Sequence, residues 1–192
     1  MKTTEILSFL PFLFKTSDVK KLEPHADIFL HRAKQRGYIE RIIRGTYLNV
    51  FKCQVADTFP GVEEVACFVH SPCYITAEWA INYHGVLLQS PKVCTVVTTR
   101  PKRKNRFLYR GYVIEYSTLK RELFFGFQYE PTLKANLAGA EKALLDLIYL
   151  RGKRIPVFDE LELDLLDKAL LQKMASKFPP YVARYCDQVL SV

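Results

Sequence analysis

The sequence predicts an α+β fold in two parts, a small N-terminal unit and a larger mixed unit. Residues 15–51 have the pattern of two short helices followed by a two-stranded hairpin. Residues 93–99 (VCTVVTT), 112–116 and 124–129 are rich in β-branched and aromatic residues, which favour strands. Residues 140–150 (AEKALLDLIYL) repeat apolar residues with the period of a helix. We therefore expect a small antiparallel sheet and several helices in the second part.

The chain begins with an apolar segment, Ile6 to Phe14, that follows Lys2. Because no small-residue cleavage site follows it, a signal peptide is not expected. It is also too short to span a bilayer, so the sequence predicts a cytoplasmic protein without a membrane segment. We expect a helix that packs Ile6, Phe9 and Leu10 inward and ends near Pro11, whose ring clashes with the carbonyl four residues earlier.

Two helices are predicted next. Thr16 and Ser17 are good N-cap residues for a helix that reaches Leu22. A second helix is expected over residues 24–36, with Pro24 in its first turn and Gly37 at its C-cap. Four apolar residues of this helix repeat with helical period and should form one buried face: Ala26, Phe29, Leu30 and Ala33. The opposite face should carry His25, Ile28, His31, Arg32 and Gln35.

A hairpin follows, with strands at residues 38–44 and 47–50, a turn at Gly45-Thr46, and Arg44 beside its tip. Two helices and a hairpin in this order are the layout of a winged helix-turn-helix. An exposed helix fits the major groove of B-form DNA, which is about 12 Å wide. The alternative is a small helical unit that serves protein contacts or dimerisation without reading DNA.

The charge of the chain also favours a polyanionic partner. Its 192 residues hold 28 Lys and Arg against 20 Asp and Glu, a formal net charge of +8. A second basic cluster, residues 100–106, contains five cations in seven positions. It has two readings, a solvated loop or a second phosphate-contact patch. The candidate DNA-binding residues are Ser17, Lys20 and Lys21 for phosphates, His25, His31, Arg32 and Gln35 for bases, Arg44 at the hairpin, and Lys102, Arg103 and Lys104 in the cluster.

The rest of the chain is expected to form the second domain, residues 53–192, after an N-terminal domain of residues 1–52. Residues 52–60 have the pattern of a linker or an extended crossover. Further elements are expected in chain order: a helix over 62–70 with Val62, Val65, Ala66 and Val69 on one face, a short extended segment at 73–75, a helix over 77–84 capped by Thr76 and closed by Gly85, and helices over 161–174 and 181–190.

The sequence shows no pattern typical of a catalytic, cofactor or metal site. The five cysteines are odd in number and scattered without a Cys-x-x-Cys, which indicates reduced, mostly buried thiols and no metal site. A nucleophile elbow and a phosphate-cradling glycine loop are both missing. Glu141-Lys142 and Asp146 share a helix surface, a pattern typical of a solvated face. The sequence therefore predicts a protein that is not an enzyme and that needs no cofactor or metal.

Two N-terminal segments, TSDVKKL and HRAKQRGYIERIIRGTYLNV, are followed in order by PCYITAEWAINYHGV, VCTVVTTRPKRK, FFGF and AEKALLDLIYL. Taken in this order, these segments resemble the AbiEi antitoxin family of prokaryotic toxin–antitoxin and phage-defence systems. The segment before Lys15 is unusually apolar for that family, which leaves room for an extra contact such as dimerisation.

The resemblance implies a transcriptional autorepressor that binds double-stranded DNA at its own operator, with inverted repeats expected there. It also implies a cognate toxin of the nucleotidyltransferase type, which the second domain counteracts without requiring a stable complex. In this setting the basic cluster at residues 100–106 has a further reading, as a surface that faces an acidic toxin.

Overall fold

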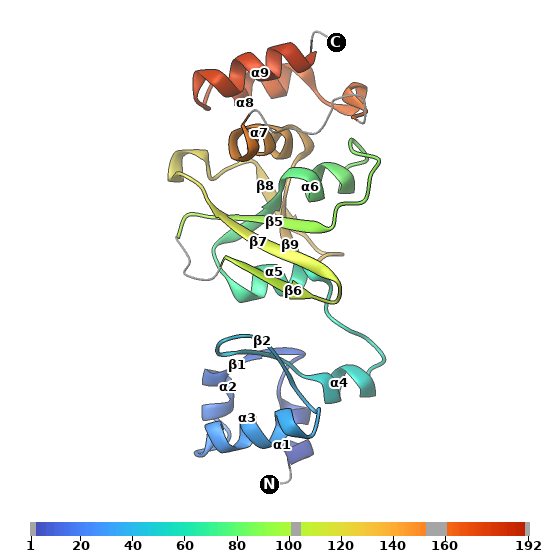
Figure 1. Ribbon diagram of the computed structural model, residues 1–192, viewed down its shortest axis with the longest axis vertical. Coiled ribbons are helices and arrows are strands. Elements are labelled where there is room, and N and C mark those ends of the chain that lie inside the picture. Colours follow the sequence, from blue (N-terminus) through green and yellow to red (C-terminus); the bar gives the residue numbers. More distant parts are fainter. Residues whose placement is uncertain (1–2, 101–104, 153–160, 191–192) are drawn as a thin grey trace. The chain divides into compact units, whose positions relative to one another are not determined.

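The chain divides into two compact units, Met1–Gly61 and Val62–Val192. The computed structural model describes residues 3–100, 105–152 and 161–190 (Figure 1). Both units combine helices with strands, so the α+β class predicted from the sequence is confirmed.

The N-terminal unit is built from short elements around one three-stranded antiparallel sheet of order β1-β3-β2. In chain order its elements are α1 (Thr3–Phe9), β1 (Leu13–Lys15), α2 (Thr16–Lys20), α3 (Ala26–Gln35), β2 (Glu40–Ile43), β3 (Thr46–Leu48) and α4 (Val50–Val55). The order helix, helix, hairpin matches the expected layout. Strand β1 was not expected, and it adds a third strand beside β3.

The core of this unit lies between α1, α2 and α3. The four apolar residues of α3 are buried as predicted, and they pack in one cluster with Ile6, Leu10, Phe14 and Val19. The prediction for α1 was wrong at one position, since Phe9 is 67% exposed and Leu7 is fully buried in its place. Helix α1 ends two residues before Pro11, as expected.

The linker predicted over residues 52–60 was wrong in its first part, because α4 occupies Val50–Val55, while residues 56–61 lead without helix or strand to the second unit. The cap of α4 is Asn49, whose Oδ1 accepts a hydrogen bond from the Lys52 N–H (3.0 Å). The same buried side chain donates through Nδ2 to the Leu7 carbonyl oxygen (2.8 Å), which ties α4 to α1. The predicted boundary between residues 52 and 53 therefore falls inside a helix of the first unit.

The helix caps also differ in detail from the prediction. Lys15 is the N-cap of α2, in place of Thr16 or Ser17, and the Asp18 carboxylate accepts its N–H (2.9 Å). Helix α3 starts at Ala26 with His25 as its N-cap, since residues 21–25 form the connection from α2. Gly37 follows α3 with φ +70, the left-handed conformation that a Gly C-cap supplies.

The second unit is organised on one six-stranded mixed sheet of order β6-β7-β5-β4-β9-β8. Its elements are α5 (Val62–Val69), β4 (Cys73–Thr76), α6 (Ala77–Tyr83), β5 (Val93–Thr98), β6 (Arg106–Tyr109), β7 (Tyr112–Thr118), the 3-10 turn Arg121–Leu123, β8 (Phe127–Glu130), β9 (Ala135–Ala138), α7 (Ala140–Arg151), the 3-10 turn Leu163–Leu165, α8 (Lys168–Ala175) and α9 (Pro180–Leu190). The sheet is thus larger than expected: β5 with β7 and β4 with β9 are parallel, and the other neighbours are antiparallel.

Helices cover both faces of this sheet, with α5 on one side and α6 and α7 on the other (Figure 1). Helices α8 and α9 pack on α7. The helix predicted over 161–174 is shorter than expected, because Asp167 caps α8 by accepting the Leu170 N–H (3.0 Å). No helix within the described ranges is long and apolar enough to cross a bilayer.

Candidate nucleic-acid interface

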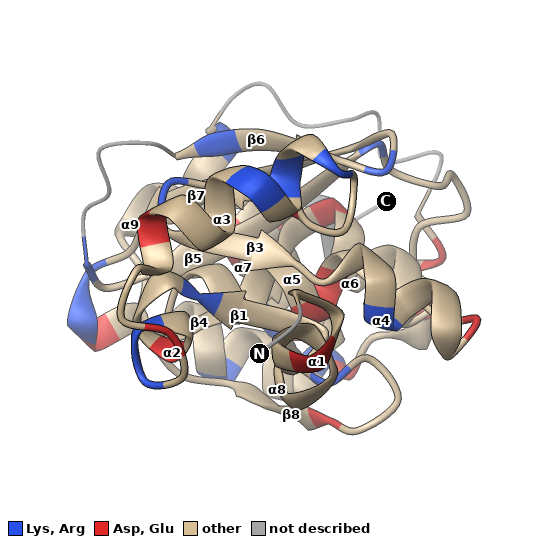
Figure 2. Cartoon of the chain, turned by 90° about the horizontal axis from the view of Figure 1, so that it is seen from below, with Lys and Arg blue, Asp and Glu red and all other residues tan. Residues whose placement is uncertain are grey.

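Helix α3 presents one open polar face opposite its buried face. His25, Ile28, His31, Arg32 and Gln35 are all exposed, as the sequence predicts, while Ala33 is fully buried. Figure 2 shows Lys and Arg positions, in blue, along α3. Helical spacing brings Ile28, His31, Arg32 and Gln35 onto one surface, since residues three and four apart are neighbours.

The predicted phosphate contacts lie on α2 and on the connection to α3. Ser17, Lys20 and Lys21 are exposed. The side chain of Lys21 is 75% exposed, and its Nζ lies 3.4 Å from an Asp18 carboxylate oxygen. A hollow of about 250 Å³ is lined by Lys20, Pro24, His25, Ala26, Asp27 and Ile28, which places Lys20 beside the start of α3.

The hairpin turn is held against the start of α2. Arg44 is exposed in the turn between β2 and β3. Gly45 adopts φ +80, and its carbonyl oxygen accepts the Thr16 N–H (3.0 Å). This bond brings the turn with Arg44 next to the segment that carries Ser17, so two of the predicted contact regions are adjacent.

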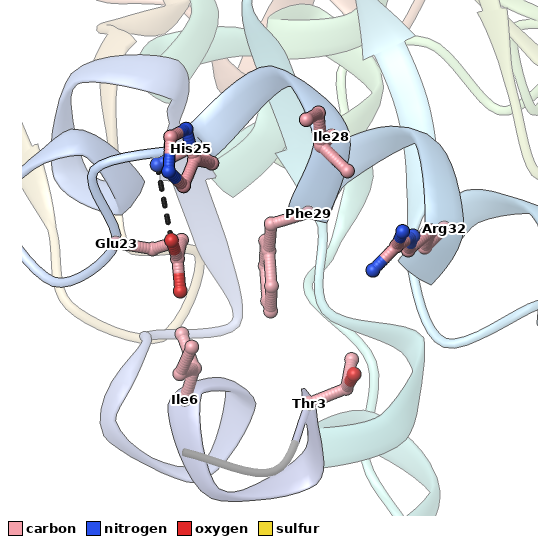
Figure 3. Close-up of a pocket in the computed structure, with 7 residues that line it drawn as sticks. All are labelled: Thr3, Ile6, Glu23, His25, Ile28, Phe29 and Arg32. Carbon is pink, nitrogen blue, oxygen red and sulfur yellow. Dashed lines mark hydrogen bonds between the residues drawn. The ribbon is translucent and has the colours of Figure 1, made fainter.

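A second hollow of about 360 Å³, the α1–α3 hollow, was not foreseen from the sequence. Its lining residues are Thr3, Ile6, Glu23, His25, Ile28, Phe29 and Arg32. Figure 3 shows Phe29 pointing from α3 towards Ile6 and Thr3 of α1. The Glu23 carboxylate accepts the His25 backbone N–H (3.0 Å), which fixes the entry into α3. The participation of α1 and Glu23 depends on tertiary packing, which no local pattern reveals.

The basic cluster of the second unit is only partly described. Lys102, Arg103 and Lys104 lie outside the described residues. Arg100 and Arg106 are exposed, and Arg106 starts strand β6. The segment between them connects β5 to β6, whereas β7 lies between these two strands in the sheet.

The solvated face predicted for Lys142 and Asp146 was wrong, because both side chains are fully buried. They form an ion pair along α7, and the Asp146 carboxylate also accepts hydrogen bonds from the Tyr74 hydroxyl and the Thr76 hydroxyl, each 2.8 Å. The Lys142 ammonium donates to the Tyr74 hydroxyl oxygen (2.7 Å). Because the Thr76 hydroxyl donates to Asp146, it forms no capping hydrogen bond at the start of α6, where the sequence predicted one.

Desolvation dominates the electrostatics of this buried cluster. Burial raises the pKa of Asp146, and the nearby Lys142 opposes that rise. Burial likewise lowers the pKa of the Lys142 ammonium. The rings of Phe125 and Phe178 lie 5.1 Å from that ammonium and help to enclose it. Because the four polar side chains satisfy one another away from solvent, the cluster fastens α7 to β4.

His84 and the five cysteines lie in structural positions. His84 lies at the end of α6, and its Nε2 is 2.8 Å from the Ala138 carbonyl oxygen. Four of the five cysteines are buried and Cys67 is partly buried, and all five are reduced thiols. Within the described residues, no three His, Cys, Asp or Glu side chains are placed to hold a metal ion.

Comparisons with known proteins agree with the N-terminal geometry. Residues 1–50 match the family model described as "Transcriptional regulator, AbiEi antitoxin". No curated protein sequence matches the chain. Among solved structures, the RV2827C protein from Mycobacterium tuberculosis shares the fold with a TM-score of 0.60 and 13% sequence identity, over 98% of this chain and 74% of that one. The resemblance expected from the sequence is therefore confirmed over residues 1–50, which are similar to transcriptional regulators of the AbiEi antitoxin family.

Proposed function

We propose that the N-terminal unit is a winged helix-turn-helix that binds double-stranded DNA at the operator of its own gene and represses transcription. The observation that carries the proposal is α3, whose apolar side is buried and whose polar, basic side is open. A helix exposed in this way can enter the major groove, and the hairpin can reach the backbone or the minor groove.

The proposed contacts divide by position. His25, His31, Arg32 and Gln35 face base edges from α3, while Ser17, Lys20 and Lys21 hold phosphates from α2 and its connection to α3. Arg44 contacts the backbone from the hairpin turn. The Thr16–Gly45 hydrogen bond supports this division, because it keeps the hairpin turn next to the start of α2 (3.0 Å). For the partly described cluster of the second unit, a further phosphate contact through Lys102, Arg103 and Lys104 stays a prediction.

Binding of the full-length protein to a duplex from the region upstream of its gene tests this proposal. Fluorescence anisotropy should give a much lower Kd for this duplex than for a scrambled duplex of equal length. Lys21→Ala should weaken binding to both duplexes and reduce the slope of log K against log salt by about 1, since one phosphate contact is lost. Lys168→Ala, at an exposed lysine of α8, is the matched control. Equal affinity for the two duplexes contradicts an operator-binding repressor.

For the second unit, we propose the antitoxin role, against a nucleotidyltransferase-type toxin in the cytoplasm and without enzymatic activity of its own. The support is the antitoxin description that the first 50 residues match. The full-length chain carrying Lys21→Ala and Arg32→Ala should still rescue growth when co-expressed with the toxin of the neighbouring gene. Growth arrest with this variant, and rescue with the wild type, would assign neutralisation to DNA binding instead.

One observation favours a second candidate, an interaction or dimerisation module. Phe9 on α1 and Ile28 on α3 are 67% and 52% exposed, and Leu22 between α2 and α3 is 41% exposed. Apolar side chains at an interface would make self-association insensitive to salt and independent of DNA. Analytical ultracentrifugation at low and high salt distinguishes this candidate from the repressor.

A further inference from the structure

Ile28 differs from its exposed neighbours on α3. Its side chain is 52% exposed, although isoleucine is among the residues most often buried. The other exposed residues of this helix are polar or charged: Asp27, His31, Arg32, Lys34 and Gln35. Ile28 therefore places a branched apolar group within a polar surface.

The position of Ile28 makes it the apolar centre of the interface. It precedes His31 by three residues and Arg32 by four, so it shares their surface on α3. It also lines both hollows of the interface, the α1–α3 hollow and the one beside Lys20. In Figure 3, Ile28 lies on α3 between His25 and Arg32, away from Phe29, which points to α1. A partner that contacts His31 and Arg32 on this surface would therefore also contact Ile28.

The surroundings of Ile28 favour DNA over a protein partner. The fully buried centre of a protein interface is depleted in charged residues, whereas Ile28 lines one hollow with Arg32 and another with Lys20 and Asp27. In the major groove each base presents donors and acceptors, and thymine adds an apolar group, its C5-methyl. A side chain such as Ile28 can bury that methyl while its neighbours bond to adjacent bases and phosphates.

We propose that Ile28 is a specificity-determining residue that contacts the C5-methyl of a thymine in the operator. The inference rests on the proposed DNA-binding function and adds to it a base identity. It requires at least one thymine beneath the middle of α3 in each bound half-site. The contact is van der Waals in nature, so it selects thymine over cytosine or uracil at that position without a hydrogen bond.

The test compares the full-length protein on two versions of the upstream duplex, amplified with either dTTP or dUTP. Uracil keeps the pairing and lacks only the methyl group. Loss of one buried methyl should raise the wild-type Kd about fourfold for each contacted thymine. Ile28→Ala should bind the two duplexes equally, while His31→Ala should bind more weakly yet keep the wild-type ratio between them.

Four outcomes are informative. A uracil effect that disappears only in Ile28→Ala supports the contact, and single thymine-to-uracil changes within the protected region then locate it. An unchanged Kd for wild type on the dUTP duplex overturns the inference and leaves operator binding intact. A uracil effect that persists in Ile28→Ala also overturns it, because the methyl then acts through another residue or through DNA shape. If the upstream duplex binds no better than a scrambled one, the proposed function itself fails.

Discussion

Arg32 carries a guanidinium on the open face of α3, a group that can bond to guanine O6 and N7 together. Replacement by alanine should cost about 1–3 kcal/mol of operator binding and remove discrimination at one base pair. Binding to operators with each base pair changed in turn measures this. Arg121→Ala, at an exposed arginine of the second unit, removes the same charge and should leave the base preference unchanged. A uniform loss across all operators would make Arg32 a phosphate contact.

Asp146 is the acceptor on which the buried cluster of α7 depends. Its replacement by alanine leaves the Lys142 ammonium unpaired in a site without solvent, so the free energy of unfolding should fall by about 3–5 kcal/mol. Lys142→Met combined with Asp146→Leu should recover part of that loss, because no charge then remains buried, although the Tyr74 and Thr76 hydroxyls lose their acceptor. Urea unfolding of each variant measures both effects. A loss below 1 kcal/mol for Asp146→Ala would mean that water reaches the ammonium.

The burial of Lys142 and Asp146 could not be predicted from the sequence. Lys142 and Asp146 are four apart on a helix, which in sequence looks like a solvent-exposed ion pair. Phe125 and Phe178 come from distant parts of the chain and surround the ammonium, so the burial is set by tertiary packing. For α3, by contrast, burial followed directly from helical periodicity, and every residue assigned to the open face is exposed.

At the scale of elements, Asn49 joins the start of α4 to α1. Asn49→Ala removes the cap of α4 and leaves the Leu7 carbonyl oxygen buried without this donor, so the N-terminal unit should lose about 1–3 kcal/mol of stability. Asn49→Asp keeps the acceptor for Lys52 but turns a buried carboxylate oxygen towards the Leu7 carbonyl oxygen, so it should be at least as unstable as Asn49→Ala. Thermal melts of the three proteins give the comparison. Equal melting temperatures would show that neither bond contributes.

Long elements with a clear period were predictable, and short elements that depend on partners were not. Helices α5 and α7 bury the residues that their apolar spacing selects. Strands β1 and β9 have only three and four residues; β1 pairs with β3, which is distant in sequence, and β9 pairs along its length with β8 and at one position with the distant β4. Helix α4 has only six residues and little periodicity, so its segment looked like a linker.

At the scale of the whole molecule, buried acids make the fold sensitive to alkali. Burial raises the pKa of the Cys186 thiol from 9.0 to about 11, and it also raises the pKa of Cys94, Tyr74 and Tyr116. A folded-state pKa above the unfolded value stabilises the protein at low pH, and that contribution is lost as pH rises from about 9 towards 11.

The expected result is a drop of at least about 1 kcal/mol in the free energy of unfolding between pH 7.5 and 10.5. Urea titrations at both pH values measure the drop. Cys186→Ala should show a smaller difference between the two, since one of the titrating groups is removed. A free energy that stays constant over this range would show that these groups are solvated in the folded state.

The exposure of the candidate interface residues was predicted from the sequence, and the shape of the surface was predicted only in part. The open face of α3 and the exposed Arg44 follow from local pattern, and their role in binding stays a prediction. The α1–α3 hollow required knowledge of how Thr3 and Ile6 approach Phe29 from a segment about 25 residues away. The sequence assigned Ile28 to the open face of α3. Its proposed role in binding rests on its exposure among polar side chains, which the structure shows.

The position of α1 beside the exposed face of α3 has a practical consequence. Thr3 lines the same hollow as Arg32, so a fusion peptide attached ahead of Thr3 starts at the edge of the exposed face of α3. A tag rich in lysine or arginine there adds cations near a bound duplex and inflates non-specific retention in a binding assay. Protein for measuring operator affinity is therefore better labelled at the carboxyl end, or freed of its tag before use.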